Sequence, residues 1–344
     1  MSAASPLLSL LEARAALAGA RVWVVSDGKA GDLNQCLGVA EQLGLQADSR
    51  IVKPRTPWRW FMPRLWSTPL GIDPAEAPGK TDGPLQGPLP QIVLASGRRA
   101  ASYLPAIKRA SGGRAFTVFL KDPRTSAEIA DFIWVPQHDA LRGPNVLATL
   151  LSPHRLSPQK LAMARSSLRP EIARLPGPRV AVLAGGTSRD FTFSRFDMVR
   201  LAADLDNLAR EGASLMITPS RRTPEDLKAA LMSVITERGG YWWEPDTPNP
   251  YFEMLATADA IVVTADSVNM VGEALVTGKP VMVFRPSGGS RKIDDFLAAV
   301  QSAGLTRPFA GTLERYSYAP QDATPLIALE LARRYFAFRS ELKT

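Results

Sequence analysis

Short apolar runs recur along this chain, and each is followed by a polar loop and then by a helical pattern. The first half holds such runs at residues 22–26, 92–95, 116–120 and 132–135, and the second half at 180–184, 215–218, 261–263 and 281–284. Apolar and polar residues do not alternate within them, which is typical of strands buried on both faces of a parallel sheet. Because helices alternate with these strands, the pattern predicts an α/β protein with two doubly wound, Rossmann-like domains.

Helical spacing of apolar residues fills several of the segments between these strands. The positions that repeat at this spacing are Cys36, Val39, Ala40 and Leu43 in the first half, and Met198, Leu201, Leu205 and Leu208 in the second. A further helix is predicted after 215–218, with Thr223 as its N-cap and Pro224 at its first position. The last helix, 324–342, follows the second sheet and is expected to cross back to the first domain.

Proline and charge mark the predicted domain limits. Residues 169–178 are rich in both, so we expect an N-terminal domain at 1–172, a C-terminal domain at 173–323 and a final helical segment at 324–344. Residues 54–90 interrupt the first domain and hold nine of the 29 prolines. This density predicts a loop or a poorly ordered insertion.

The stretch 259–284 carries the clearest functional signal. An apolar strand breaks into a small polar turn, and a helix follows that ends near Gly278. Ser267 is suited to cap this helix, whose first N–H groups then face whatever lies above the sheet. Helix starts of this kind bind anions, phosphate above all. Glu273, six residues after the cap, is placed to accept hydrogen bonds from a ribose.

Polar and glycine-containing loops follow four strands of the second half, at the sheet edge where ligands bind in parallel α/β folds. Glycines permit close approach of the backbone, hydroxyls donate hydrogen bonds, and arginines neutralise a diphosphate. The candidate nucleotide-binding residues in these loops are Gly185, Gly186, Thr187, Ser188, Ser220, Arg221, Arg222, Ser267, Val268, Asn269 and Arg285. Together with Glu273, they predict a nucleotide site on this half of the chain.

The corresponding loops of the first half carry candidates for acceptor binding or proton transfer. Those for acceptor binding are Lys29, Gly31, Asn34, Gln35, Ser96, Gly97, Arg98, Lys121, Arg124 and Asp139. Of the two histidines, His138 directly follows a strand and is the better general-base candidate, with Asp139 to orient it. Asp27 and Asp32 are alternative catalytic bases. The competing interpretation of His138 is a loop residue with a structural hydrogen bond.

Composition narrows the classes of partner. The net charge of +8 favours anionic partners such as nucleotide phosphates or acidic lipid, and no basic stretch resembles a nucleic-acid-binding motif. No apolar run approaches the 18 residues that span a bilayer. Cys36 is the only cysteine, which excludes an intrachain disulfide and a cysteine-based metal site and fits a reducing cytoplasm.

Several familiar motifs are missing from the sequence. There is no P-loop, no G-x-G-x-x-G after a strand, no HExxH and no G-x-S-x-G elbow. We therefore expect neither a metal nor a cofactor, so that helix starts and basic side chains would neutralise any bound diphosphate.

Residues 58–66, WRWFMPRLW, hold three of the seven tryptophans beside two arginines. Tryptophan and arginine suit a membrane interface, where rings lie at headgroup level and cations meet anionic lipid. The expected membrane contacts are Trp58, Arg59, Trp60, Phe61, Arg64 and Trp66. The alternative is that these rings pack against the first domain.

Seven segments of the chain resemble those of the mitochondrial-fission protein family. They are SDGKAGDLNQ (26–35), KDPR (121–124), PQHD (136–139), LAGGTSRDF (183–191), TPSRRTP (218–224), NPYFEMLATAD (249–259) and TADSVNMVGEA (264–274). They occur in order over nearly the whole chain and leave the proline-rich insertion uncovered. Plant members of that family are associated with mitochondrial division, and bacterial members are often called epimerase-like proteins of nucleoside diphosphate sugars.

The second half also resembles, more distantly, the nucleotide-sugar domain of GT-B glycosyltransferases of lipid A and peptidoglycan synthesis. The resemblance implies that residues 267–269 face a donor diphosphate, that Glu273 holds the ribose, and that the base lies near 245–251, including Tyr251. It also implies two domains facing a cleft and a reaction without a metal ion. Such enzymes often carry a basic, apolar membrane patch on the first domain, to which residues 58–66 correspond.

Three functional hypotheses follow. The first is an enzyme that transfers a sugar from a nucleoside diphosphate to a lipid-linked or cell-envelope acceptor, located in the cytoplasm and peripheral to the membrane. The second is a non-catalytic, membrane-associated protein that uses the same site to bind a nucleotide or a partner. The third is a nucleotide-sugar epimerase, which needs no acceptor. The expected partners are a nucleoside diphosphate sugar and anionic lipid, without nucleic acid.

Overall fold

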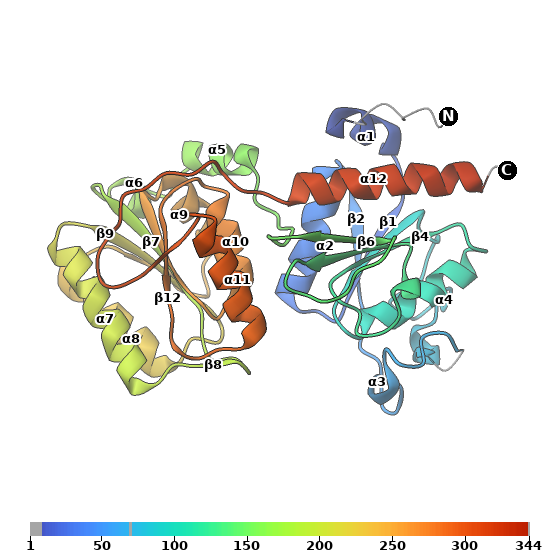
Figure 1. Ribbon diagram of the computed structural model, residues 1–344, viewed down its shortest axis with the longest axis horizontal. Coiled ribbons are helices and arrows are strands. Elements are labelled where there is room, and N and C mark those ends of the chain that lie inside the picture. The colour runs from blue at the N-terminus through green and yellow to red at the C-terminus, as the bar shows by residue number, and fades with distance from the viewer. Residues whose placement is uncertain (1–8, 69–70, 343–344) are drawn as a thin grey trace. The chain divides into compact units, whose positions relative to one another are not determined.

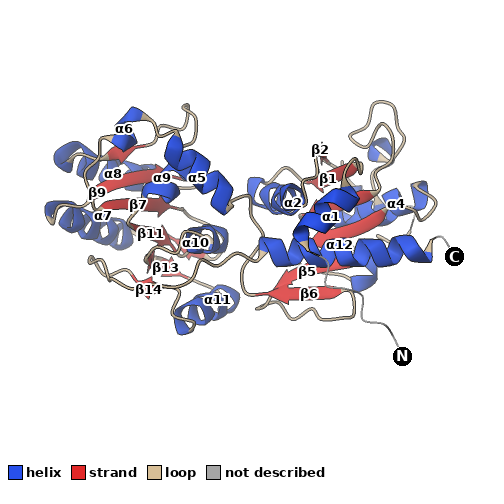
Figure 2. Ribbon diagram, turned by 90° about the horizontal axis from the view of Figure 1, so that it is seen from above, coloured by secondary structure: helices blue, strands red, loops and turns tan. Residues whose placement is uncertain are grey.

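The computed structural model describes residues 9–68 and 71–342, which form two compact units. Unit 1 comprises the chain up to Arg155 together with the segment from Ala323 onwards, and unit 2 comprises Leu156–Asp322. Each unit holds one six-stranded parallel sheet with helices on both faces (Figures 1 and 2). The prediction of two doubly wound α/β domains is therefore confirmed.

The sheet of unit 1 has the strand order β2-β1-β3-β4-β5-β6, with every neighbouring pair parallel. The strands are β1 (Val22–Ser26), β2 (Ala47–Ile51), β3 (Ile92–Ser96), β4 (Phe116–Leu120), β5 (Phe132–Pro136) and β6 (Val146–Thr149). The four inner strands match the apolar runs of the sequence. The two edge strands were not predicted, because β2 is polar and both are largely half-exposed.

Helices and the proline-rich insertion cover the two faces of this sheet. On one face pack α1 (Leu10–Leu17), α2 (Ala30–Gln42) and α12 (Thr324–Glu341). On the other pack η3 (Ala100–Ser102), α4 (Tyr103–Ala110) and the insertion, with η4 (Ala127–Ile129) contributing a buried side chain. The last helix thus returns to the first domain, as expected, because Ile327, Leu331 and Tyr335 form a buried stripe at helical spacing.

Of the two predictions for residues 54–90, a loop or a poorly ordered insertion, the described residues correspond to the loop, because most of them lie in turns and irregular segments. The segment contains α3 (Trp58–Phe61) and η2 (Pro74–Glu76), and it buries Met62, Ile72 and Leu85 in the core of unit 1. Asp73, completely buried, accepts hydrogen bonds from Nε and Nη2 of Arg55 at 2.8 Å. The buried apolar side chains and the ion pair between the exposed Arg55 and the buried Asp73 hold these turns against the sheet.

The sheet of unit 2 repeats this plan in the order β10-β9-β7-β11-β12-β14. Its strands are β7 (Arg179–Ala184), β9 (Ser214–Pro219), β10 (Tyr241–Trp242), β11 (Ala260–Thr264), β12 (Val281–Phe284) and β14 (Arg307–Pro308). The helices α7 (Arg195–Arg210) and α8 (Glu225–Arg238) pack on one face. The helices α9 (Tyr251–Thr257), α10 (Val268–Leu275) and α11 (Arg291–Ser302) complete the unit, with a small antiparallel sheet of β8 (Phe191–Thr192) and β13 (Ser287–Gly288).

Two details of unit 2 differ from the sequence prediction. Thr223 does not cap α8, which begins at Glu225; its hydroxyl instead donates to the carbonyl of Gly185 at 2.5 Å. The expected domain boundary at 169–178 lies within unit 2. The reason is that α5 (Pro158–Ser166), which precedes α6 (Pro170–Ala173), already packs against α9.

Candidate functional site

Strand order places one topological switch point in each unit. In unit 1 the chain proceeds to β2 on one side of β1 and to β3 on the other, and in unit 2 β9 and β11 flank β7 in the same way. Ligands of doubly wound folds bind beyond the carboxyl ends of the strands at this point. The loops that meet there are 27–29 with 96–99 in unit 1, and 185–190 with 264–267 in unit 2.

In unit 2 the switch point is organised around Asp266, which the sequence analysis had not singled out. Its completely buried carboxylate accepts hydrogen bonds from the backbone N–H of Gly186 at 2.9 Å, from the Thr264 hydroxyl at 2.7 Å and from Arg222 Nη2 at 2.9 Å. Burial raises the pKa of this carboxyl, while these three partners act in the opposite direction. Asp266 therefore ties together the loops after β7, β9 and β11.

The two glycines after β7 are required by this packing. A Cβ at Gly185 would lie 2.1 Å from the carboxylate of Asp266, and a Cβ at Gly186 would lie 2.0 Å from the carbonyl carbon and oxygen of Arg222. The backbone N–H of Thr187 donates to that same carbonyl at 3.2 Å. From the sequence we expected these glycines to allow close approach of a ligand. In the structure they allow close approach of Asp266 and of the loop at Arg222.

The helix start beside this network has the expected cap. Ser267 precedes α10, and its hydroxyl accepts a hydrogen bond from the backbone N–H of Met270 at 3.4 Å. Val268 and Asn269 form the first turn and are half-buried. The positive end of the helix dipole thus lies at the switch point of unit 2, directly after Asp266, the ion-pair partner of Arg222.

Glu273, on the same helix, has one polar partner of particular interest. Its Oε2 accepts a hydrogen bond from the Tyr251 hydroxyl at 2.6 Å. Burial raises the pKa of Glu273 to about 7, against the effect of that hydrogen bond. Burial and the neighbouring carboxylate raise the pKa of Tyr251 well above its usual value. Two residues predicted at the nucleotide site from separate segments are therefore in direct contact.

Other candidates of unit 2 make contacts within their own loops. The Ser188 hydroxyl accepts hydrogen bonds from the N–H groups of Asp190 and Phe191, and Ser220 contacts the Thr223 hydroxyl. Arg221 is exposed. Arg285 forms an ion pair with Asp294 of α11 at 2.7 Å, so its guanidinium is directed to that helix.

In unit 1 the structure brings several predicted residues together at the switch point. Asp32 Oδ1 accepts a hydrogen bond from Lys121 Nζ at 3.1 Å. The Ser96 hydroxyl donates to the carbonyl of Leu120 at 2.9 Å, and its oxygen lies 3.3 Å from Asp32 Oδ1 and 3.5 Å from Gln35 Oε1. Asp27 Oδ2 pairs with Lys29 at 3.2 Å. At Gly97, where φ is +100°, a Cβ would lie 2.9 Å from Asp27 Oδ1 and 3.2 Å from Asp32 Oδ2. Two carboxylates and two lysines thus cluster where β1, β3 and β4 end.

The remaining candidates of unit 1 have other contacts. His138 lies 4.0 Å from Asp139, measured from Nε2 to Oδ1, and both side chains are nearly buried. Arg124 adopts a positive φ of 59° and pairs with Asp122. Arg98 is exposed. Gly31 and Asn34 lie in the first turns of α2, which begins at Ala30.

The aromatic segment divides into a packed and an exposed part. Trp58 and Trp66 are half-buried and pack against the core of unit 1, as the alternative interpretation held. Trp60 and Phe61 remain 64% and 47% exposed, with Arg59 and Arg64 exposed beside them in the chain.

Within residues 9–68 and 71–342, no helix has the length and hydropathy needed to cross a membrane. In the same residues, no group of three or more His, Cys, Asp or Glu side chains could hold a metal ion.

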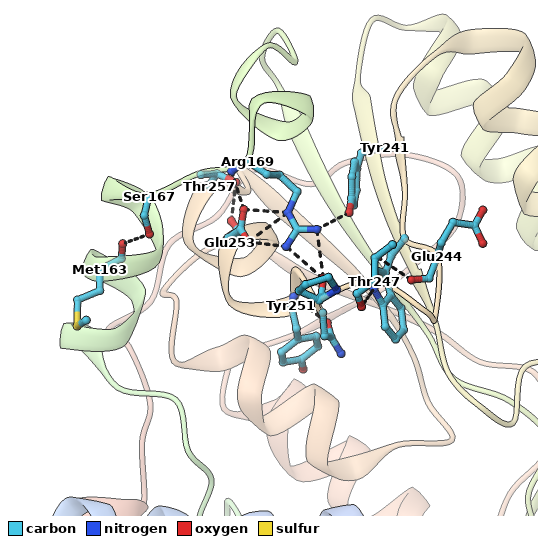
Figure 3. Close-up of polar contacts among 12 residues, drawn as sticks. Met163, Ser167, Arg169, Tyr241, Glu244, Thr247, Tyr251, Glu253 and Thr257 are labelled. Carbon is cyan, nitrogen blue, oxygen red and sulfur yellow. Dashed lines mark hydrogen bonds and ion pairs between the residues drawn. The ribbon is translucent and has the colours of Figure 1, made fainter.

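A second residue missed by the sequence analysis is Arg169, which was assigned to a domain linker. It forms a two-oxygen ion pair with Glu253 and also binds Tyr241 and the carbonyl of Pro248 (Figure 3). No local pattern could have revealed these partners, because they lie 72 to 84 residues away in the sequence.

Comparison with known proteins gives both a family and a fold. A family model described as "Mitochondrial fission ELM1" matches residues 30–335. Mitochondrial fission protein ELM1 of Arabidopsis thaliana is 27% identical over 403 residues, covering 93% of this chain and 93% of that protein. Uncharacterized protein RP120 of Rickettsia prowazekii (strain Madrid E) is 24% identical over 347 residues, covering 89% and 96%.

Solved structures with the same architecture include two that hold a uridine nucleotide. UDP-GlcNAc 2-epimerase from Neisseria meningitidis, bound to UDP-GlcNAc, matches with a TM-score of 0.51 at 12% identity over 94% of this chain and 100% of its own. The S. aureus MnaA–UDP co-structure matches with a TM-score of 0.54 at 10% identity, over 92% and 97%. At such identities the likeness concerns the fold, and it confirms the GT-B-like pair of Rossmann-like domains.

Proposed function

This chain belongs to the family described as Mitochondrial fission ELM1, and from that premise we propose that its second unit binds a nucleoside diphosphate sugar. The observation that carries the proposal is the convergence of Arg222, the capped start of α10 and the Glu273–Tyr251 pair at one end of one sheet. A helix start and a guanidinium suit a diphosphate, and a carboxylate two turns along the helix suits a ribose diol. The base would lie near residues 245–251.

The reaction we propose is glycosyl transfer to a lipid-linked or cell-envelope acceptor, without a metal ion. Such a transfer needs a proton acceptor for the attacking hydroxyl, and Asp27, Asp32 and His138 are the candidates. Asp27 is favoured, because no donor among the described residues lies within hydrogen-bond distance of its buried Oδ1, whereas Asp32 Oδ1 already accepts a hydrogen bond from Lys121. An Asp27→Asn variant would then retain donor binding and lose turnover.

A second candidate reaction, epimerisation of the sugar nucleotide, is favoured by a specific observation. Both solved structures described above hold a uridine nucleotide, and the first is a UDP-GlcNAc 2-epimerase. Incubation of the protein with UDP-GlcNAc alone separates the two reactions, because an epimerase converts the sugar without an acceptor. If the epimer appears, the proposed reaction is epimerisation and not glycosyl transfer. Nucleotide binding with neither reaction would favour the non-catalytic role.

Nucleotide binding itself is tested by thermal-shift measurements with UDP, GDP, CMP and their sugars. A ligand at 100 times its dissociation constant stabilises the native protein by about 2.7 kcal/mol, which raises the melting temperature measurably. We expect one nucleoside diphosphate to give this shift, and Glu273→Gln to weaken its binding about tenfold by removing the charged acceptor of the ribose hydroxyls. Glu237→Gln, an exposed change on α8, should have no effect. Failure of every nucleotide to shift the wild type would refute the proposal.

Membrane association would arise from the exposed tip of the insertion. Trp60 and Phe61 present large apolar surfaces beside Arg59 and Arg64, a combination that suits a bilayer with anionic headgroups. We expect the wild type to sediment with phosphatidylserine-containing vesicles and not with pure phosphatidylcholine, and the double variant W60S/F61S to bind at least about tenfold more weakly. Phe196→Ser, which changes a similarly exposed ring of unit 2, is the matched control. Equal binding of both variants would contradict the proposed surface.

A further inference from the structure

We infer that Arg169 is a positioning residue for the nucleoside end of the site in unit 2, an inference that rests on the proposed nucleotide binding. Arg169 immediately precedes α6 and touches neither Arg222 nor Asp266 in any contact of the described residues. It reaches instead the segment between β10 and α9, where the base is proposed to lie.

The contacts of Arg169 enclose that segment from both ends (Figure 3). Before the segment, its Nη1 donates to the Tyr241 hydroxyl at 2.8 Å. At the end of the segment, both terminal nitrogens donate to the carbonyl of Pro248 at 3.2 Å. Beyond it, Nη2 and Nε donate to the carboxylate of Glu253 at 2.7 and 3.1 Å, and the backbone N–H of Arg169 donates there as well, at 2.8 Å. One side chain thus fixes a strand, a loop and a helix.

Burial makes this arrangement rigid. The side chains of Arg169 and Glu253 are only 20% and 18% exposed. Burial acts to raise the pKa of Glu253, but the hydrogen bonds and charge of Arg169 outweigh it and hold the pKa below its usual value. A planar guanidinium that meets both carboxylate oxygens has one preferred orientation, which an ammonium group cannot reproduce.

The loop also has internal contacts that transmit this position to Glu273. Trp243 Nε1 donates to the carbonyl of Thr247 at 3.2 Å, and Asn249 Oδ1 accepts from the backbone N–H of Tyr251 at 2.9 Å. Tyr251 begins α9, the helix that carries Glu253, and its hydroxyl binds Glu273. A shift of α9 would therefore move the hydrogen-bond partner of the carboxylate proposed to hold the ribose.

This role predicts a selective effect, since the diphosphate end has its own supports. The Asp266–Arg222 pair and the start of α10 share no hydrogen bond with Arg169 among the described residues. Loss of the guanidinium should therefore weaken recognition of a nucleoside and leave recognition of inorganic pyrophosphate unchanged. A residue that merely stabilises unit 2 would affect both ligands alike.

The test is isothermal titration of the full-length protein with UDP and, separately, with inorganic pyrophosphate. We expect Arg169→Lys to weaken UDP binding about tenfold, equal to about 1.4 kcal/mol, with pyrophosphate affinity within about twofold of wild type. Glu253→Gln should do the same, and the double variant should add little, because the two residues act as one unit. If Arg169→Lys does not fold, Glu253→Gln provides the same comparison of UDP and pyrophosphate binding.

Arg165→Lys is the matched control, because Arg165 also binds α9, through the carbonyl of Ala256 at 2.6 and 2.9 Å, yet contacts neither Tyr241 nor the loop in the hydrogen bonds described. It should leave both affinities unchanged. Equal weakening of UDP and pyrophosphate by Arg169→Lys, or unchanged UDP binding, would overturn the inference. If the wild type binds pyrophosphate and no nucleoside diphosphate, the proposed function fails first, and the inference with it.

Discussion

Gly186→Ala should destabilise unit 2 by more than about 3 kcal/mol, at the upper end of the cost of overpacking a core. The added Cβ would lie 2.0 Å from the carbonyl carbon and oxygen of Arg222 and 2.4 Å from the backbone nitrogen of Thr223. Backbone atoms cannot rotate away as a side chain can, so the loops after β7 and β9 must separate. That separation would also break the hydrogen bond from Thr187 to Arg222. The free energy of unfolding in urea measures the loss.

Two further glycine-to-alanine substitutions serve as comparisons for the expected loss of stability. The nearest atoms to a Cβ in Gly185→Ala belong to a side chain, the carboxylate of Asp266, so this change should cost less than Gly186→Ala. Gly143→Ala places its Cβ no closer than 3.5 Å to any neighbour and should change stability by less than about 1 kcal/mol. If Gly186→Ala were as stable as Gly143→Ala, the close approach of these two loops would not exist in solution.

The second large effect is the contribution of Glu273 to the dependence of stability on pH. Its pKa is about 7 in the folded protein and about 4.5 in the unfolded chain. Between these values the unfolded chain has released the proton that the folded protein retains. The contribution of this carboxyl is therefore full below about pH 4.5 and declines as the pH rises to 7, by on the order of 3 kcal/mol in total.

Comparison with Glu273→Gln isolates this contribution from every other titration. The difference in unfolding free energy between wild type and variant should change steadily from pH 5 to pH 7 and then level off. The wild type loses stability over this range relative to the variant, because Glu273 releases its proton more readily in the unfolded chain than in the folded protein. Glutamine does not titrate, so the variant lacks this effect. A difference that does not vary with pH would show that Glu273 has an ordinary pKa. Since the ionised form is the better acceptor for ribose hydroxyls, nucleotide affinity should rise as the pH passes through about 7, where the folded carboxyl ionises.

The two effects concern opposite ends of the proposed site. Gly186 lies where the diphosphate would bind, and the glycine is needed so that Asp266 can gather three loops into one surface. Glu273 lies where the nucleoside would bind, and its carboxylate accepts a hydrogen bond from the Tyr251 hydroxyl. A nucleoside diphosphate would thus meet Arg222 and the start of α10 with its phosphates, and with its ribose a carboxylate whose charge depends on pH near neutrality.

The local chemistry of the sequence determined the inner strands and the start of the key helix. Val22–Ser26, Phe116–Leu120 and Val281–Phe284 are apolar throughout, apart from single small hydroxyl residues, so their burial in a parallel sheet needs no knowledge of distant residues. Ser267 caps α10 through an N–H three residues away, which is also a local interaction. The edge strand β2 was missed because solvent on one side permits polar residues there, and its sequence is ADSRI.

Only the tertiary structure decided which side chains meet. Asp266 binds Gly186 across 80 residues, and Arg169 binds Glu253 across 84, because the order β9-β7-β11 brings distant loops to one sheet edge and α9 packs beside the segment that enters unit 2. Spacing along a chain specifies contacts within a helix turn or a strand, where the backbone geometry is fixed. It does not specify the partner of a loop, since that depends on which strands lie side by side.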